Sequence, residues 1–98
     1  MPMFIAALTV EFSLEGNDNL KAKRRIANSL KQKTRNAFNV AIAEAGTENS
    51  LTRLRLIALS LSNDERHLRG RMDKCVAMME TVCPEPMTSS EVEIDVLG

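Results

Sequence analysis

The sequence predicts an α+β fold with four strands and two helices in the order β-α-β-β-α-β. Residues 4–15 alternate between apolar and polar side chains, which is typical of a strand with one buried face. Residues 20–38, and the segment between Ser62 and Pro84, instead place apolar residues at helical spacing. The 98 residues suit one domain, 1–98, and leave no room for a second.

Turn and capping residues mark the limits of the first helix. Gly16 begins a turn, and one of the side chains at 17–19 (Asn-Asp-Asn) can cap the helix that follows. The helix is expected to end at Asn39, a residue type that tolerates the left-handed conformation common at such ends.

Three further strands complete the pattern. Residues 40–45 and 54–61 predict the second and third strands, and the nearly continuous apolar character of the third favours a central position in the sheet. Residues 91–97 alternate again and predict the fourth strand. With right-handed crossovers, this order compacts into a ferredoxin-like two-layer sandwich, in which a four-stranded antiparallel sheet carries both helices on one face.

The composition limits the classes of function. Thirteen basic and 13 acidic side chains give a formal net charge of zero, which excludes a uniformly polycationic protein but not a local basic patch. No apolar run reaches the roughly 18–20 residues of a membrane span, so no membrane partner is expected. The N-terminus lacks a basic leader, and the two cysteines suit free thiols in a reducing compartment, so the chain is expected in the cytoplasm.

The first helix holds the most informative charge pattern. Between Lys21 and Arg35 it carries seven of the 13 basic residues and no acid. Four of them lie near the helix start, where the helix dipole disfavours cations, so this region suits an anion such as phosphate. We predict contacts with rRNA, the ribosome or another polyanion; the alternative is a solvated basic face. The predicted anion-binding residues are Lys21, Lys23, Arg24, Arg25, Lys31 and Arg35.

Lys23 lies at the angular centre of the apolar stripe of this helix. The sequence favours a lysine that lays its stem on the core and extends its ammonium group to solvent. The alternative is a catalytic lysine, which would need a pocket around it.

Little in the sequence indicates catalysis or a metal site. His67 is the only histidine, and its spacing from Cys75 and Cys83 differs from that of zinc ligands. The nucleophile-elbow, phosphate-loop and dinucleotide-binding motifs do not occur. We therefore expect a noncatalytic protein without metal or cofactor. A weaker alternative is a small-molecule or enzymatic site near Lys23, Arg53 and His67, and the predicted secondary site comprises Arg53, Arg66 and His67.

The predicted sheet leaves one face uncovered by helices. Phe4 and Phe12 share the parity of the buried residues, so the open face carries no aromatic ring on which a base could stack. Its residues are mostly small or aliphatic: Ile5, Ala7, Thr9, Ala41, Ala43, Ile57 and Leu59. Such an apolar face predicts, as the alternative function, a homo-oligomer formed through the sheet face or through edge strands.

Four blocks of sequence resemble one family. They are Asn-Leu-Lys-Ala-Lys-Arg-Arg at 19–25, Arg-Asn-Ala-Phe-Asn-Val-Ala-Ile-Ala-Glu at 35–44, Thr-Arg-Leu at 52–54 and Ser-Asn-Asp-Glu-Arg-His-Leu at 62–68. In order and spacing they resemble the YlxP-like family of small bacterial proteins over roughly residues 3–97. The resemblance implies a ferredoxin-like fold and no assigned activity. Because members are often encoded beside translation initiation and ribosome-maturation factors, it also implies an association with the ribosome or RNA.

The resemblance also marks characteristic positions of the family. In this sequence they are Leu20, Lys21, Lys23, Arg24, Arg25, Asn36, Phe38, Asn39, Glu44, Arg53, Ser62, Asn63, Asp64, Arg66 and His67. The chain departs from the family in the loop 46–52, where Thr47 and Leu51 stand in place of a histidine and a tryptophan. A role for this loop in base stacking or proton transfer is therefore not expected here.

Overall fold

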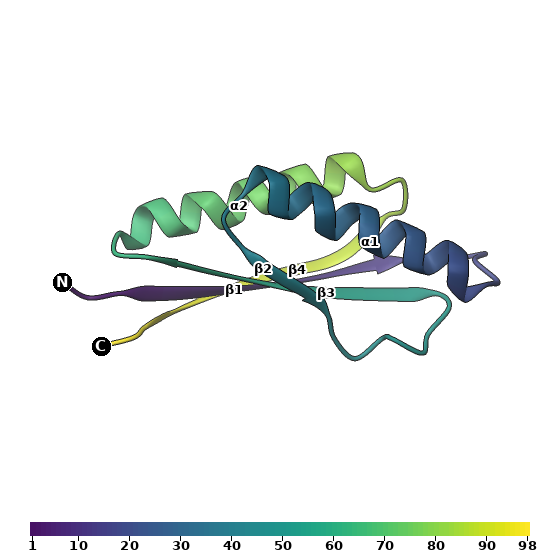
Figure 1. Ribbon diagram of the computed structural model, residues 1–98, viewed down its shortest axis with the longest axis horizontal. Helices are drawn as coiled ribbons and strands as arrows, with labels where there is room; N and C mark the ends of the chain where they lie inside the picture. Colours follow the sequence, from purple (N-terminus) through teal and green to yellow (C-terminus); the bar gives the residue numbers. More distant parts are fainter.

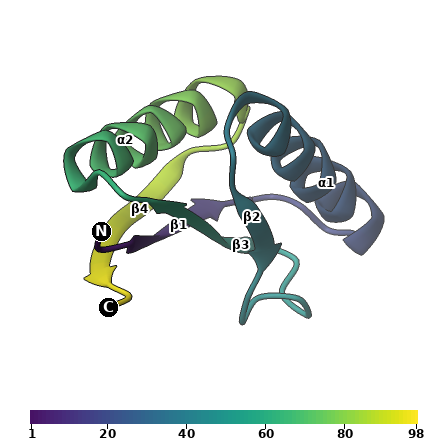
Figure 2. The ribbon, with the colours of Figure 1, turned by 60° about the vertical axis from the view of Figure 1, so that its left-hand side comes forward.

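Both helices pack on the same face of a four-stranded antiparallel sheet (Figure 1 and Figure 2). The computed structural model describes all 98 residues. The elements are β1 (Phe4–Ser13), α1 (Leu20–Ala37), β2 (Ala41–Glu44), β3 (Arg53–Ser62), α2 (Glu65–Val82) and β4 (Met87–Val96). The strands lie in the order β2-β3-β1-β4, so the predicted ferredoxin-like fold is confirmed.

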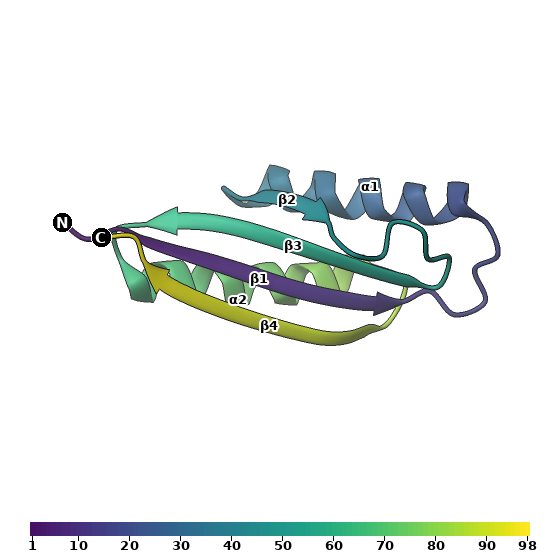
Figure 3. The same cartoon turned by 90° about the horizontal axis from the view of Figure 1, so that it is seen from below.

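The two long central strands, β1 and β3, form the middle of the sheet. They pair antiparallel over ten residues each, from Phe4 opposite Ser62 to Ser13 opposite Arg53. The predicted central position of β3 is confirmed, with β2 on its other side. Figure 3 shows the four strands from the side that no helix covers. The alternation of β1 therefore decides which side chains enter the core and which face the open side.

The hydrophobic core fills the space between the sheet and the helices. Strands β1 and β3 contribute alternate residues, and each helix contributes one stripe. In α2 this stripe is Leu68, Met72, Cys75 and Met79, at the spacing of a half-buried helix. The largest fully buried apolar side chains are Leu8, Phe12, Leu14, Leu54, Leu56, Leu68, Met72 and Met79.

The start of α1 agrees with the sequence prediction, and its end does not. At the start, the side-chain oxygen of Asn19 accepts a hydrogen bond from the Ala22 amide at 2.7 Å, as a helix cap does. At the other end, the prediction that Asn39 adopts the left-handed conformation is wrong, because no residue other than glycine has a positive φ. The helix ends at Ala37, and Phe38 is already extended at a φ of −136°. Phe38 packs against the core, and the chain continues almost at once into β2.

Strand β4 begins earlier than its sequence suggests. It begins at Met87 rather than at residue 91, because Ser89 and Ser90 pair with Glu11 and Val10 of β1. This stretch lacks an apolar alternation, so it carries no strand pattern. As an edge strand, β4 is exposed enough to accept polar side chains on both faces there.

The molecule is elongated along its strands, with extents of 49 × 23 × 20 Å. Both chain ends lie at the same end (Figure 1), where the Leu97 amide donates a hydrogen bond to the Met3 carbonyl at 2.7 Å. Neither helix is long and apolar enough to cross a membrane.

The buried thiol of Cys75 predicts a pH dependence of stability. Burial raises its pKa from 9.0 to about 11, although the Arg71 charge lowers it in part. The unfolded chain releases this proton near pH 9 and the folded chain does not, so the stabilisation is complete below pH 9 and is lost as the pH rises to about 11. We expect the free energy of unfolding in urea to fall by about 2 kcal/mol from this group across the range.

The control is Cys75→Ala, measured over the same range. This variant should be less stable at neutral pH, because it leaves a small cavity, but its stability should fall less steeply between pH 9 and 11. Equal slopes for the variant and the original chain would contradict the assignment.

Candidate nucleic-acid interface

Six cations of α1 form what we call the basic surface. Its members are Lys21, Arg24, Arg25, Lys31, Lys33 and Arg35. Lys31 is half-buried and the other five are exposed. The helix contains no acid, and the only two ion pairs of the structure use other cations, Lys23 and Arg53. The positive charge of the basic surface therefore has no counterion within the protein.

The helix spreads this charge along its length. Arg24, Lys31 and Arg35 stand at i, i+7 and i+11, which places them on one side of α1. Arg25 and Lys33 lie on the side that faces α2. Eighteen residues make a helix about 27 Å long, so the cations form an extended surface rather than a single point of binding.

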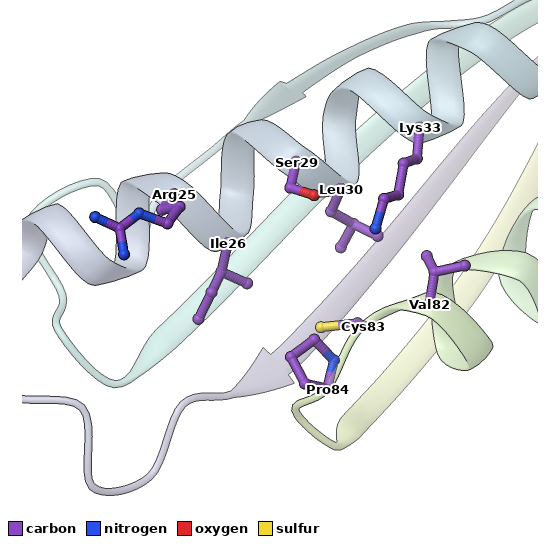
Figure 4. A pocket seen from close by; sticks show the side chains of 8 residues that line it. All are labelled: Arg25, Ile26, Ser29, Leu30, Lys33, Val82, Cys83 and Pro84. Carbon is purple, nitrogen blue, oxygen red and sulfur yellow. The ribbon is translucent and has the colours of Figure 1, made fainter.

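Between α1 and α2 lies a small groove of about 210 Å³ (Figure 4). Ile26, Leu30 and Val82 give it apolar walls. In Figure 4, Lys33 extends its ammonium group toward the groove, whereas the guanidinium of Arg25 points along the helix and away from it. Because the two cations do not converge, we treat this groove as a flank of the basic surface and not as an anion pocket.

Lys23 does not belong to the basic surface, and the expectation that its ammonium group reaches solvent is wrong. The residue is only 1% exposed. Its Nζ lies 2.9 Å from a carboxylate oxygen of Glu44 at the end of β2. It also donates hydrogen bonds to the carbonyl oxygens of Thr47 and Ser50. With all its donors used inside the protein, Lys23 has none left for an external anion.

The loop 46–52 supplies the acceptors that make this burial feasible. The Thr47 hydroxyl donates to the same Glu44 oxygen at 2.7 Å and accepts from the Arg55 amide at 3.0 Å. The Ser50 hydroxyl accepts from the Arg53 amide at 3.1 Å. Thr47 is thus a buried structural residue. Sequence reasoning missed this network because its members are distant in sequence and individually unremarkable polar residues.

The structure separates the members of the predicted secondary site. Arg53 lies at the start of β3, where it pairs with Glu11 at 2.9 Å. Arg66 and His67 lie in the first turn of α2, which follows the other end of β3. A ten-residue strand is about 30 Å long, so one ligand cannot join Arg53 to His67. For the same reason, Lys23, Arg53 and His67 do not form one shared site.

Arg66 and His67 instead line a second cavity, of about 540 Å³, which we call the basic hollow. Its other residues include Gly70, Arg71 and Lys74 of α2, with Phe38 after the end of α1. The spacing of His67, Arg71 and Lys74 at i, i+4 and i+7 is the sequence signal that places these three side chains on one side of α2. The contribution of Phe38 could not be foreseen, since it comes from a different element.

The open sheet face has the composition that the alternation predicts. Ile5, Ala7 and Thr9 stand opposite Leu61, Leu59 and Ile57 across β1 and β3. Phe12 is buried under the helices and Phe4 packs against the core, so neither ring is on this face. Leu59 is 42% exposed and Leu61 50% exposed. The predicted placement of Phe4 and Phe12 on the buried face is therefore confirmed.

Metal-binding geometry is also not found. No group of three or more His, Cys, Asp or Glu side chains lies close enough to hold a metal ion. Cys75 and Cys83 are both free and buried.

Comparisons with known proteins give a family and a fold. A family model described as "Protein of unknown function (DUF503)" matches residues 5–92. No curated protein matches the chain. Among solved structures, a structural-genomics protein, YJCS, is 9% identical with a TM-score of 0.50, over 91% of this chain and 96% of that one.

Two other solved structures have lower TM-scores. The de novo designed protein Foldit4 is 11% identical with a TM-score of 0.48, over 98% of this chain and 97% of that one. A dimeric ferredoxin-like protein from an uncultured marine organism is 6% identical with a TM-score of 0.44, over 98% and 94%. At such identities, the likeness to YJCS shows the fold alone.

The Lys23 network predicts a stability defect with a specific signature. Lys23→Met should lower the free energy of unfolding by about 3–5 kcal/mol, because Glu44 and two loop carbonyls lose the cation that satisfies them. Denaturant unfolding checks this value. Glu44→Gln should lower the free energy of unfolding much less in the Lys23→Met variant than in the original chain, because the two residues interact directly.

Lys21→Met is the matched control, since Lys21 is exposed on the same turn of α1 and has no ion pair. It should leave the unfolding midpoint nearly unchanged. Equal effects of the two substitutions would contradict the role assigned to the buried ammonium group.

Proposed function

This chain belongs to the DUF503 family of proteins of unknown function, and we propose that it is a noncatalytic protein that binds the phosphate backbone of RNA through α1. The observation that carries the proposal is the basic surface, six cations without an acid on the helix or an ion pair. Binding an anion there offsets both their mutual repulsion and their unfavourable position near the helix start.

The composition of the remaining surface favours contacts with phosphates over contacts with bases. Base recognition in single strands relies on aromatic platforms or on amide and guanidinium groups placed at base edges. The open sheet face carries no ring, and the cations of α1 stand on a convex helix surface. We therefore expect affinity that depends strongly on salt and weakly on sequence.

The YlxP-like resemblance gives this proposal a more specific form. Its association with translation and ribosome-maturation factors makes rRNA the class of partner that we favour. The two free cysteines agree with a cytoplasmic protein, as that partner requires.

A second candidate function is self-association through the open sheet face. Leu59 and Leu61 are large, apolar and about half exposed there, beside Ile5 and Ala7. A second copy suits this face because a two-fold interface needs one self-complementary patch. The acids Glu91, Glu93 and Asp95 of β4 point to the same open side, so the interface must centre on β1 and β3 and keep the two β4 edges apart. The edge strand itself is less suitable, because two such acidic edges would repel each other.

RNA binding is tested by charge reversal on the basic surface. The variant Arg24→Glu with Arg25→Glu should lower the affinity for a labelled RNA hairpin at least tenfold at low salt, measured by fluorescence anisotropy. For about four phosphate contacts, log Kobs should fall with log salt at a slope of roughly −3, and the variant should show a shallower slope.

The matched control carries the same change in net charge outside α1. Arg55→Glu with Arg69→Glu should bind the hairpin nearly as the original chain does, apart from a small long-range effect. The proposal fails if both double variants lose affinity equally or if the original chain does not bind at low salt.

Self-association is tested by one substitution on the open face. Leu59→Glu should convert a dimer into a monomer in sedimentation or light scattering, because it places a charge in the centre of the apolar patch. Leu51→Glu, at another exposed leucine outside the sheet, is the control and should leave the mass unchanged. A monomer at high concentration for the original chain would reject this second candidate.

A further inference from the structure

The basic hollow, at the start of α2, is lined by basic side chains whose charge is not paired within the fold. It is an open depression of about 540 Å³ lined mostly by polar residues, which is large enough to admit a phosphate group and part of the molecule that carries it. Arg66, His67, Arg71 and Lys74 line it, and none of them takes part in an ion pair. No cation of α1 contributes to it, so it is a separate site from the basic surface.

Arg71 is the best-positioned cation of the hollow. It is half-buried, and its guanidinium donates hydrogen bonds to the Ser60 hydroxyl at 2.7 Å and to the Leu61 carbonyl at 3.1 Å. Both acceptors are neutral, so they fix the orientation of the guanidinium without neutralising it. A guanidinium held in this way has further N–H groups for a phosphate or carboxylate.

Gly70 is an unusual residue for the interior of α2. Glycine is the least favourable helix residue after proline, and a glycine in a helix normally has a packing reason. Here a Cβ at position 70 would meet no atom within 4 Å. Nothing in the fold therefore requires the glycine, whereas its missing side chain leaves space on the wall of the hollow.

The one acidic residue at the border of the hollow already has a hydrogen-bonding role in the fold. Asp64 caps α2, and its carboxylate accepts a hydrogen bond from the His67 amide at 3.0 Å. The capped helix end is thus not the binding element. Even with Asp64 included, the cations lining the hollow outnumber its acids.

We propose that the basic hollow binds a phosphate monoester, with Arg71 as its principal ligand, Lys74 and Arg66 adding charge, and Gly70 leaving room for the ligand. Phe38 gives one border an apolar ring, so the hollow suits a ligand with a flat or apolar body beyond the phosphate. The phosphate is either that of a small phosphorylated molecule or the terminal phosphate of an RNA strand. This proposal does not depend on RNA binding by α1.

The test is an NMR titration of backbone amides with adenosine monophosphate, inorganic phosphate and adenosine, at constant ionic strength. Adenosine monophosphate and phosphate should produce saturable shifts at Gly70 and Arg71, and adenosine should not. The proposal is overturned if adenosine acts like the monophosphate, or if the shifts fall on α1 instead.

Gly70→Met separates binding from folding. The substitution should raise the thermal unfolding midpoint, because methionine favours the helix and position 70 is open, and yet weaken binding of the monophosphate at least tenfold, because the long side chain occupies part of the hollow. Asn28→Met, at an exposed position of α1, should also favour its helix but leave binding unchanged. Binding by Gly70→Met that equals the original chain would overturn the proposal.

Competition identifies the source of the phosphate. If only a hairpin with a 5′-phosphate displaces the monophosphate, the ligand is an RNA end; if no hairpin displaces it, the ligand is a small molecule. Equal displacement by a hairpin with a 5′-hydroxyl would assign the binding to backbone diesters and overturn the proposal. Arg24→Glu with Arg25→Glu should retain monophosphate binding even where it loses RNA.

Discussion

The buried ammonium group of Lys23 determines how α1 sits on the sheet. It joins the first turn of the helix to β2 through Glu44, and to the following loop through two carbonyl oxygens. A buried cation without such partners would be very costly, so the helix is stable only in the orientation that meets them. In that orientation the side of α1 opposite Lys23 faces solvent, and the basic surface lies there.

Net neutrality conceals a separation of charge between the two layers. Seven cations and no acid lie on α1, whereas the open side of β4 carries Glu91, Glu93 and Asp95. On the proposed function, this separation directs a polyanion to the helical layer and away from this edge of the sheet. The same separation protects β4, since an acidic edge strand pairs poorly with a copy of itself.

Local patterns predicted the elements well and the sites only in part. Alternation in β1 identifies its buried face because alternate residues along the whole strand lie in the core between the sheet and the helices. The sequence did not predict the first residues of β4, because an edge strand accepts polar side chains on both faces and these show no alternation. For Lys23, the helical pattern placed the residue in the core correctly, but its partners lie 21 or more residues further on. Arg53 and His67 were grouped by residue type, which carries no information on distance.

The basic surface of α1 and the open sheet face lie on opposite layers of the molecule, so RNA and a second copy of the chain do not compete for the same space. A dimer formed through the open sheet faces would direct both copies of α1 outward, away from the interface. Each helix would then meet a different segment of RNA, and linking two such contacts raises the overall affinity well above that of either alone. Loss of the dimer through Leu59→Glu would then weaken RNA binding without changing any cation. In such a dimer, the two proposed activities, self-association and RNA binding, would be thermodynamically linked.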